Sequence, residues 1–267
     1  MVAQVLMLSL CLEMLFTDRP FEARIRAAAE AGYPAFEFWD WRNKNLKQVS
    51  ETANACGLRV TAFSGNRLHA MANPADRGGF REEIKQSLDT AAQVGASTLM
   101  LLSDILREDG SAAPLPAQLS AKDKLESVTE CLAEAAALAE GSGVVMALEP
   151  LNTRLDHPGY FLDNSAAGFE LVRRVGSPRA RLLYDAYHMA MMGEDIDAVV
   201  ESNLDLIGHV HVADLPGRHE PGSGEFNYHS FAGILRRRNY TGAIGMEFSP
   251  SGDSAAAAEA ARRIFQA

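Results

Sequence analysis

The sequence predicts an α/β protein, a single (β/α)₈ barrel that spans residues 1–267. Eight short apolar runs of the buried-strand type alternate with amphipathic helical segments. A length of 267 residues is ordinary for one barrel of this kind. A doubly wound open sheet would usually carry a glycine-rich phosphate loop after its first strand, and none follows here. No linker or low-complexity tract divides the chain, so a second domain is not expected.

The predicted strands are short and rich in aliphatic and β-branched residues, which is typical of strands buried on both faces. Glycines that commonly end helices precede several of them, at positions 32, 57, 95, 143 and 242. The eight strands are expected at residues 5–10, 35–39, 58–63, 97–102, 144–149, 181–185, 206–212 and 243–248.

The segments between these strands have helical amphipathicity. The clearest helices are expected at 19–33, 80–96 and 122–143. The alanine-rich tail from Ser254 onward is expected to be the last barrel helix.

Composition excludes several classes of partner. The net charge of −10 argues against binding to nucleic acids or to anionic membranes, because both require basic surfaces. The N-terminus has no basic region and Glu13 interrupts its apolar run, so no signal peptide is expected. Three widely spaced cysteines form no metal or disulfide pattern, which fits a reducing compartment. We therefore expect a cytoplasmic protein.

The last four predicted strands each carry a metal-competent side chain near the C-terminal end. These side chains are Glu149, Asp185, His211 and Glu247. The C-terminal ends of barrel strands share one face, which is the catalytic face of such barrels. Three carboxylates and an imidazole at one mouth would destabilise each other's charges unless a cation lay between them. The sequence therefore predicts a metal-dependent enzyme with these four ligands.

The predicted ligand set restricts the metal. Three oxygen ligands and one nitrogen favour Mg²⁺ or Mn²⁺ over a metal of soft-ligand sites. The imidazole moves the preference toward Mn²⁺ or Co²⁺, and Zn²⁺ stays open.

Several segments resemble the hydroxypyruvate isomerase family of the xylose-isomerase-like barrels, to which the ketose 3-epimerases are related. The resemblance covers nearly the whole chain and is weakest at 64–120. Its most specific part is the run HVADLPGRHEPGSGEFNY at 211–228, within the segment IGHVHVADLPGRHEPGSGEFNY. The other segments are LEPLNTRLDHPGYFL, LLYDAYHM, GAIGMEFSP and the opening LCLEMLFTDRPFEARIRAAAEAGYPAFEF.

The resemblance implies roles for individual residues. Glu149 and Glu247 fall on the family's two acid/base glutamates, which also bind the metal, and Asp185 and His211 fall on its other ligands. Some hydroxypyruvate isomerases carry glutamine at the position of His211, so this histidine favours the sugar epimerases.

Two further residues are implied to bind substrate. His188 matches a substrate-contacting histidine of the related epimerases, and Arg218 corresponds approximately to their substrate-binding arginine. A planar guanidinium would pair well with a substrate carboxylate. The loop at 217–225, which carries this arginine, is expected to cover the site.

The implied reaction interconverts hydroxypyruvate and tartronate semialdehyde, or a similar short hydroxy-keto acid. A proton moves between adjacent carbons through an enediolate that a divalent metal stabilises. The alternative is a ketose 3-epimerase or a 2-oxotetronate or sugar isomerase of the same superfamily. The resemblance thus implies a small-molecule substrate as the binding partner. Members of the family are often oligomeric, so a homo-oligomer is expected.

Two other classes are weaker. Metal-dependent abasic-site endonucleases share the barrel, but they need several zinc ions held by more histidines, and basic surface for DNA; this chain has seven histidines and is acidic. A non-catalytic sugar-binding subunit would not need both glutamates.

Three residues outside the ligand set lie near the predicted site. His209 lies two residues from His211 and shares its strand face, so it is expected behind the ligands. Trp39 and Trp41 flank the second strand's end, where they either wall a pocket or pack in the core.

Overall fold

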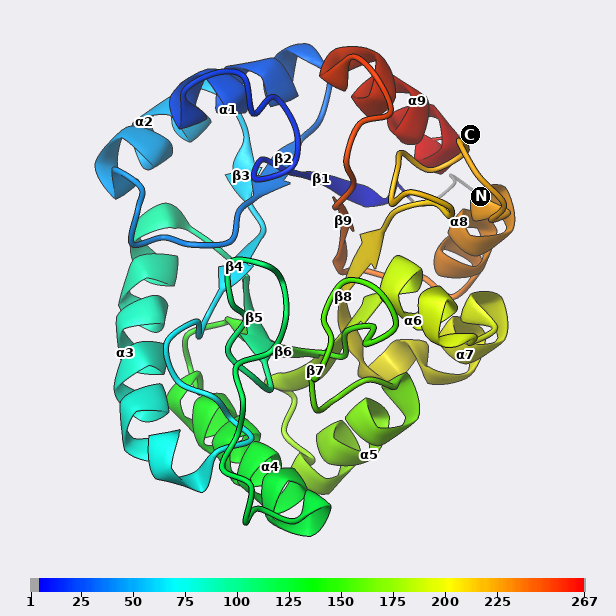
Figure 1. Ribbon diagram of the computed structural model, residues 1–267. Helices are drawn as coiled ribbons and strands as arrows, with labels where there is room; N and C mark the ends of the chain where they lie inside the picture. The colour runs from blue at the N-terminus through cyan, green and yellow to red at the C-terminus, as the bar shows by residue number, and fades with distance from the viewer. Residues whose placement is uncertain (1–4, 267) are drawn as a thin grey trace.

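The computed structural model describes residues 5–266, which form a closed barrel of parallel strands ringed by helices (Figure 1). The hydrogen-bonded order is β3-β2-β1-β9-β8-β7-β6-β5-β4. The strands are β1 (Met7–Cys11), β2 (Ala35–Glu37), β3 (Arg59–Val60), β4 (Ala62–Ser64), β5 (Thr98–Leu102), β6 (Val145–Glu149), β7 (Ala180–Asp185), β8 (Ile207–Val212) and β9 (Ala243–Met246).

The strand predicted at 58–63 is divided into β3 and β4, and Thr61 lies between them. The Thr61 amide donates to the carbonyl of Phe36 on β2, at 3.0 Å. Its carbonyl accepts from the amide of Thr98 on β5, at 3.0 Å. One extended segment thus pairs with both neighbours and closes the sheet. The nine assigned strands of the described chain make eight barrel positions, which confirms the predicted fold class.

The helices form the outer ring (Figure 1). Those predicted at 19–33, 80–96 and 122–143 correspond to α1, α3 and α4, and all three end earlier than expected. The bounds are α1 (Phe21–Glu30), α2 (Leu46–Cys56), α3 (Arg77–Val94), α4 (Ala121–Leu138), α5 (Ser165–Val175), α6 (Ala186–Met192), α7 (Ile196–Asn203), α8 (Tyr228–Arg237) and α9 (Ser254–Gln266).

The glycines expected to end helices act in two ways. Gly57 and Gly95 adopt the left-handed conformation directly after α2 and α3, with φ of 68° and 73°. Gly242 does not, because Asn239 makes the left-handed turn after α8, with φ of 55°. Gly242 is instead required by space, since a Cβ there would lie 2.7 Å from the carbonyl oxygen of Gly208.

The barrel interior has an apolar side and a polar side. Ala62, Met100, Ala147 and Leu183, on the neighbouring strands β4 to β7, form a small buried apolar cluster of their own. The strands on the other side of the barrel carry buried polar groups, among them Ser9, Glu37, His209 and His211. The polar side places ionisable groups where water cannot solvate them, so they need specific partners.

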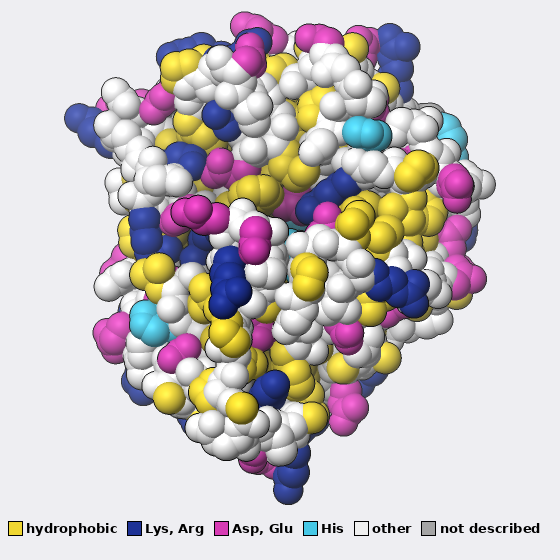
Figure 2. All heavy atoms as spheres, in the orientation of Figure 1, with side chains coloured by type: hydrophobic (Ala, Val, Ile, Leu, Met, Phe, Trp, Pro, Cys, Tyr) yellow, Lys and Arg dark blue, Asp and Glu magenta, His cyan; other side chains and the backbone are white. Residues whose placement is uncertain are grey.

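The loops that follow β5 and β6, residues 103–120 and 150–164, lie over the C-terminal ends of the strands (Figure 1). Figure 2 shows the same face, where acidic and basic side chains surround a central hollow. Within residues 5–266, no helix combines the length and apolar character needed to span a bilayer.

Candidate active site

The four predicted ligands come together at the C-terminal mouth of the barrel. Glu149 ends β6, Asp185 ends β7, His211 lies one residue before the end of β8, and Glu247 directly follows β9. All four are buried, with exposures of 6% or less. Nδ1 of His211 lies 3.3 Å from Glu149, 3.5 Å from Glu247 and 3.9 Å from Asp185. One ligand atom from each residue lies within 4.8 Å of all the others.

These distances fit a shared cation better than a set of hydrogen bonds. Nδ1 of His211 is buried and has no hydrogen-bond partner within residues 5–266, although three carboxylates face it. Metal–ligand bonds of about 2.1 Å place neighbouring ligands roughly 3.0 to 3.4 Å apart. The donor set of three carboxylates and one imidazole is therefore suited in spacing and chemistry to a divalent metal ion.

The pKa values of the buried groups also indicate a site for a cation. Burial raises the pKa of Asp185 to about 7, and the neighbouring charges of Glu247 and Glu149 act in the same direction. Burial would also raise the pKa of Glu247, but the positive charges of His211 and Arg218 hold it well below its ordinary value. Burial opposes charging of His211, but Glu247 and Glu37 raise its pKa well above the usual range. A divalent cation would stabilise the ionised carboxylates together.

A buried carboxylate lies behind the ligand histidine. Glu37, at the end of β2, accepts a hydrogen bond from Nε2 of His209 at 3.0 Å, and its other oxygen lies 2.9 Å from Nε2 of His211. Burial opposes the charge of Glu37, but the two histidines lower its pKa to about 2. Such a carboxylate orients a metal-binding imidazole and raises its basicity.

Gly245 makes room for this pair of side chains. A Cβ at this position of β9 would lie 2.2 Å from Oε1 of Glu37 and 2.5 Å from the ring of His211. Contacts under about 3 Å require the neighbours to move. The glycine is therefore part of the site's construction, although it supplies no ligand.

Asp185 and His188 are positioned by the start of α6. Oδ1 of Asp185 accepts from the backbone N–H of His188 at 3.0 Å, which caps the helix and leaves Oδ2 facing the other ligands. The side-chain oxygen Oδ1 of Asn152 accepts from two backbone N–H groups of its own loop, so the side-chain nitrogen Nδ2 donates to Nδ1 of His188 at 2.6 Å. Burial and the charge of Arg218 lower the pKa of His188. His188 is thus a neutral imidazole whose Nε2 carries the proton.

Glu247 is held through both carboxylate oxygens. Nε1 of Trp39 donates to Oε1 at 2.7 Å, and the Arg218 guanidinium donates to Oε2. The Arg218 backbone is left-handed, with φ of 55°, which costs energy for a residue with a side chain. The Asp214 carboxylate fixes this loop by accepting backbone hydrogen bonds from Leu215, Gly222, Gly224 and Phe226. The predicted substrate arginine is therefore paired with a glutamate in this structure.

A cavity of about 340 Å³ opens above these groups. His188, Arg218, Glu149 and Glu247 line it, and so does Trp39. The remaining lining residues are Ser64, Arg67, Met100, Leu102, Leu106, Arg107, Glu108, Gly110, Leu151 and His157.

The sequence left open whether Trp39 and Trp41 wall a pocket or pack in the core. Trp39 lines the cavity, whereas Trp41 donates to Ser87 and packs elsewhere. Sequence reasoning missed two other lining residues, Arg67 and Arg107, which lie in the 64–120 segment, where the family resemblance was weakest. Glu37 could have been found by the rule that identified the other acids, since it too is an acid at a strand end.

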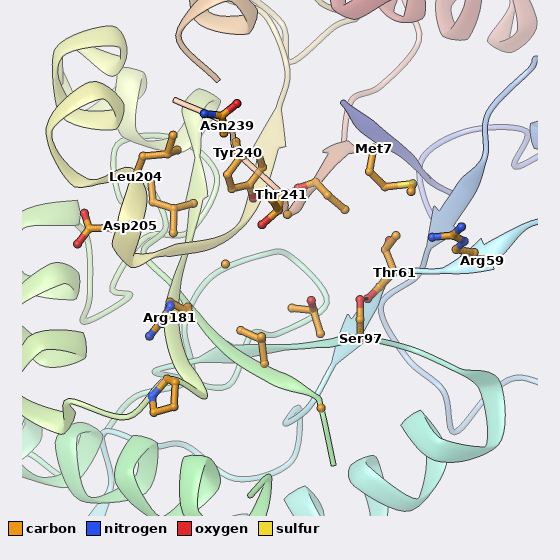
Figure 3. Close-up of a pocket in the computed structure, with 18 of the residues that line it drawn as sticks. Met7, Arg59, Thr61, Ser97, Arg181, Leu204, Asp205, Asn239, Tyr240 and Thr241 are labelled. Carbon is orange, nitrogen blue, oxygen red and sulfur yellow. Dashed lines mark hydrogen bonds between the residues drawn. The ribbon is translucent and has the colours of Figure 1, made fainter. Parts of the chain in front are cut away.

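A second and larger cavity, about 710 Å³, lies at the opposite, N-terminal mouth of the barrel (Figure 3). Thr61, Ser97, Arg181 and Thr241 are among its lining residues. Neither of the two ligand clusters found in residues 5–266 includes a residue that lines it.

The fold and the ligand cluster define a (β/α)₈ barrel with a metal-competent centre at its C-terminal mouth. Comparison with known proteins gives the family. The chain belongs to the xylose isomerase-like TIM barrel family, whose model matches residues 25–267.

Curated relatives match over most of their length. A putative hydroxypyruvate isomerase of Streptomyces coelicolor is 31% identical over 264 residues, which cover 92% of this chain and 91% of the relative. A 2-oxo-tetronate isomerase of Cupriavidus necator is 30% identical over 253 residues, covering 92% and 93%. The chain thus falls in the hydroxypyruvate and 2-oxo-tetronate isomerase group of the family. Among solved structures, one titled AP endonuclease, family 2, from Brucella melitensis is similar, with a TM-score of 0.86, 28% identity and coverage of 94% and 95%.

Proposed function

We propose that this protein is a metal-dependent isomerase that interconverts hydroxypyruvate and tartronate semialdehyde, or a closely similar short hydroxy-keto acid. The observation that carries the proposal is the buried cluster of Glu149, Asp185, His211 and Glu247. The relatives named for hydroxypyruvate and 2-oxo-tetronate support the substrate class. A cavity of about 340 Å³ suits a substrate of few carbons.

The reaction moves a weakly acidic proton between adjacent carbons, so it needs a base near the substrate. Glu149 and Glu247 both line the cavity, and they come from β6 and the residue after β9. We assign them the proton transfers as well as metal binding. The four ligand residues would hold a divalent ion, which when bound would supply Lewis-acid stabilisation of the charge that develops on the substrate oxygens.

His188 and Arg218 complete the proposed machinery. The neutral His188 presents an Nε2–H that can donate to a substrate oxygen. Arg218 holds Glu247 in place and stabilises its ionised form, which keeps this carboxylate available as a proton acceptor. We propose Mg²⁺ or Mn²⁺ as the working metal, because hard oxygen ligands dominate the set.

The test is product analysis by NMR in D₂O with Mn²⁺-loaded enzyme. Hydroxypyruvate, 2-oxotetronate and a free ketose are supplied in separate reactions. Turnover of hydroxypyruvate with deuterium at the carbon next to the carbonyl supports the proposal. Clear turnover of the ketose, with exchange at its third carbon and none with hydroxypyruvate, rejects it in favour of a 3-epimerase.

The ketose 3-epimerase is the second candidate, and His211 favours it, because the resemblance associates histidine here with the epimerases. Two glutamates at one cavity also suit exchange on both faces of a carbon. The D₂O experiment separates the two activities, because isomerisation and epimerisation label different carbons.

One similar solved structure is titled an AP endonuclease, but this chain lacks the basic surface that an abasic-site endonuclease needs to bind DNA. The net charge of −10 would repel a DNA backbone. The predicted four-ligand centre has a single histidine. The cytoplasmic location and the homo-oligomer remain predictions of the sequence.

A further inference from the structure

The substrate cavity contains positive charge that the metal centre does not use. Arg67, Arg107 and Arg218 all line it, in a chain whose net charge is −10. Arg218 is already paired with Glu247. Within residues 5–266, the guanidinium groups of Arg67 and Arg107 have neither a hydrogen-bond partner nor an ion-pair partner. Two arginines therefore face the cavity with their donors free.

The backbone that carries Arg67 is fixed from beneath. The buried carboxylate of Glu83 accepts from the backbone N–H groups of Arg67 at 2.7 Å and of Leu68 at 3.1 Å. The side chain of Asn66 is fully buried and pairs with both the N–H and the C=O of Leu102, each at 3.0 Å. These contacts fix the backbone at Arg67 but do not involve its side chain. The guanidinium therefore stays available for a ligand.

Arg107 lies on the loop that covers the cavity, and it is exposed. The loop is a short hairpin, joined by a bridge between Leu106 and Ala112. It is attached to the loop after β6 by a contact of 2.9 Å between Nδ1 of His157 and the carbonyl of Gly110. Arg107 thus lies on the loop that covers the cavity, whereas Arg67 lies in the cavity wall, on the segment that follows β4.

We propose that Arg67, assisted by Arg107, binds the carboxylate of a hydroxy-keto acid substrate and so makes the site select acids over neutral ketoses. The planar fork of an arginine matches a carboxylate in two parallel hydrogen bonds. A fixed backbone lowers the entropy lost when the guanidinium is immobilised. A substrate carboxylate also needs such a partner here, because Glu108, Glu149 and Glu247 line the same cavity and would repel it.

This inference rests on the proposed function only in placing the substrate in this cavity. The assignment gives the two ends of the substrate different partners. The carbons that exchange a proton lie toward Glu149 and Glu247, and the carboxylate lies toward Arg67. A neutral ketose offers the guanidinium only uncharged oxygens, whose hydrogen bonds are weaker than those of a carboxylate, so the same residue that improves binding of an acid gives much less gain for a sugar.

The test uses matched acid and neutral ligands with the full-length protein. Binding of D-glycerate and of glycerol is measured by calorimetry, and isomerisation of hydroxypyruvate is compared with hydrogen exchange of dihydroxyacetone in D₂O. The variants are Arg67→Met, which keeps the apolar stem, and Arg67→Lys, which keeps the charge but loses the fork. Arg59→Met removes an exposed arginine at the opposite mouth and is the control (Figure 3).

The expected result is a loss confined to the acids. Arg67→Met weakens D-glycerate binding and raises the KM for hydroxypyruvate by about 10- to 100-fold, since charge-assisted pairs are the strong ones. Its glycerol binding and dihydroxyacetone exchange stay within about twofold. Arg67→Lys recovers part of the loss, Arg107→Met shows a smaller one, and Arg59→Met shows none.

Two outcomes overturn the proposal: wild-type protein that binds D-glycerate no better than glycerol, and an Arg67→Met variant with unchanged D-glycerate affinity. Failure of the proposed function looks different. In that case wild-type protein does not turn over hydroxypyruvate, while D-glycerate binding still depends on Arg67. Melting temperatures identify any variant that has lost its fold. If Arg67→Met is unfolded, the D-glycerate affinity of Arg67→Lys decides whether the arginine binds the carboxylate.

Discussion

The two mouths of the barrel differ in a way that cavity size would not reveal. The N-terminal cavity is about 710 Å³ and the C-terminal one about 340 Å³. Yet the smaller cavity is lined by the buried carboxylates. The larger one is lined by groups such as Thr61 and Ser97, whose hydroxyls donate to neighbouring backbone carbonyls. Of the two mouths, the chemistry therefore lies at the one where burial leaves charge uncompensated, and not at the one with the larger cavity.

The comparison also shows what each mouth contributes to the molecule. At the N-terminal mouth, the Arg181 guanidinium donates to the carbonyls of Ser177 and Ala180, so it stabilises the local backbone. At the C-terminal mouth, Nδ1 of His211 is left without a hydrogen bond within the described chain. We read the first arrangement as structural and the second as prepared for a ligand. Paired substitutions at the two mouths can test this division.

The largest effect is expected from Glu149→Gln. The amide cannot accept the proton and is a weaker metal ligand, so kcat falls by about 10³-fold or more. Steady-state kinetics with saturating Mn²⁺ measure the loss. Asp205→Asn makes the same chemical change beside the N-terminal cavity and should leave kcat within about twofold. Similar losses in both variants would contradict the division between the mouths.

Gly245→Ala should damage the metal centre without touching a ligand. The added methyl would lie 2.2 Å from Oε1 of Glu37 and 2.5 Å from the His211 ring, so both must shift. We expect metal affinity to fall by about 100-fold, at the upper end of the effects of disturbing a ligand's support. Calorimetric titration of the metal-free protein with Mn²⁺ measures it.

Gly208→Ala is the matched control, on β8 at the other mouth. Its Cβ would lie 2.7 Å from the Arg181 side chain and 2.8 Å from that of Val145. Both variants should lose stability, by about 1 to 3 kcal/mol each, because both overfill packed space. Only Gly245→Ala should lose Mn²⁺ affinity. Equal affinity losses would mean that crowding anywhere in the barrel disturbs the site.

A smaller effect is expected from Glu37→Gln. The amide retains its size and can still hydrogen-bond His209, but it no longer places a negative charge behind His211. Mn²⁺ affinity should fall by about tenfold, since outer carboxylates raise the basicity of a ligand imidazole. The same titration measures it. An unchanged affinity would show that Glu37 only fills space.

The sequence could predict the barrel because strand position and helix amphipathicity are local properties of the chain. It also predicted which four residues converge, since the fold brings successive strand ends to one mouth. Thr61 shows a limit of this reasoning, because the division of one strand into β3 and β4 depends on its pairing with Phe36 and Thr98.

Contacts between distant segments set the other limits. The placement of Glu37 beside His211 depends on barrel closure, which joins residues 174 positions apart in the chain. The pairing of Arg218 with Glu247 depends on a loop conformation that Asp214 fixes through backbone hydrogen bonds. Arg67 had no motif to mark it, and only its place in the cavity wall identifies it.

The smallest expected effect belongs to Arg181→Met at the N-terminal mouth. The change removes the hydrogen bonds to the carbonyls of Ser177 and Ala180, at 3.0 and 2.8 Å, while keeping an apolar side chain of similar length. Denaturant unfolding should show a loss of about 1 kcal/mol in the free energy of unfolding. The value of kcat/KM should stay within about twofold, because the guanidinium contacts neither the ligand cluster nor the substrate cavity. A tenfold fall in kcat/KM at unchanged stability would mean that the two mouths are coupled through the barrel interior, and that the N-terminal cavity participates in function after all.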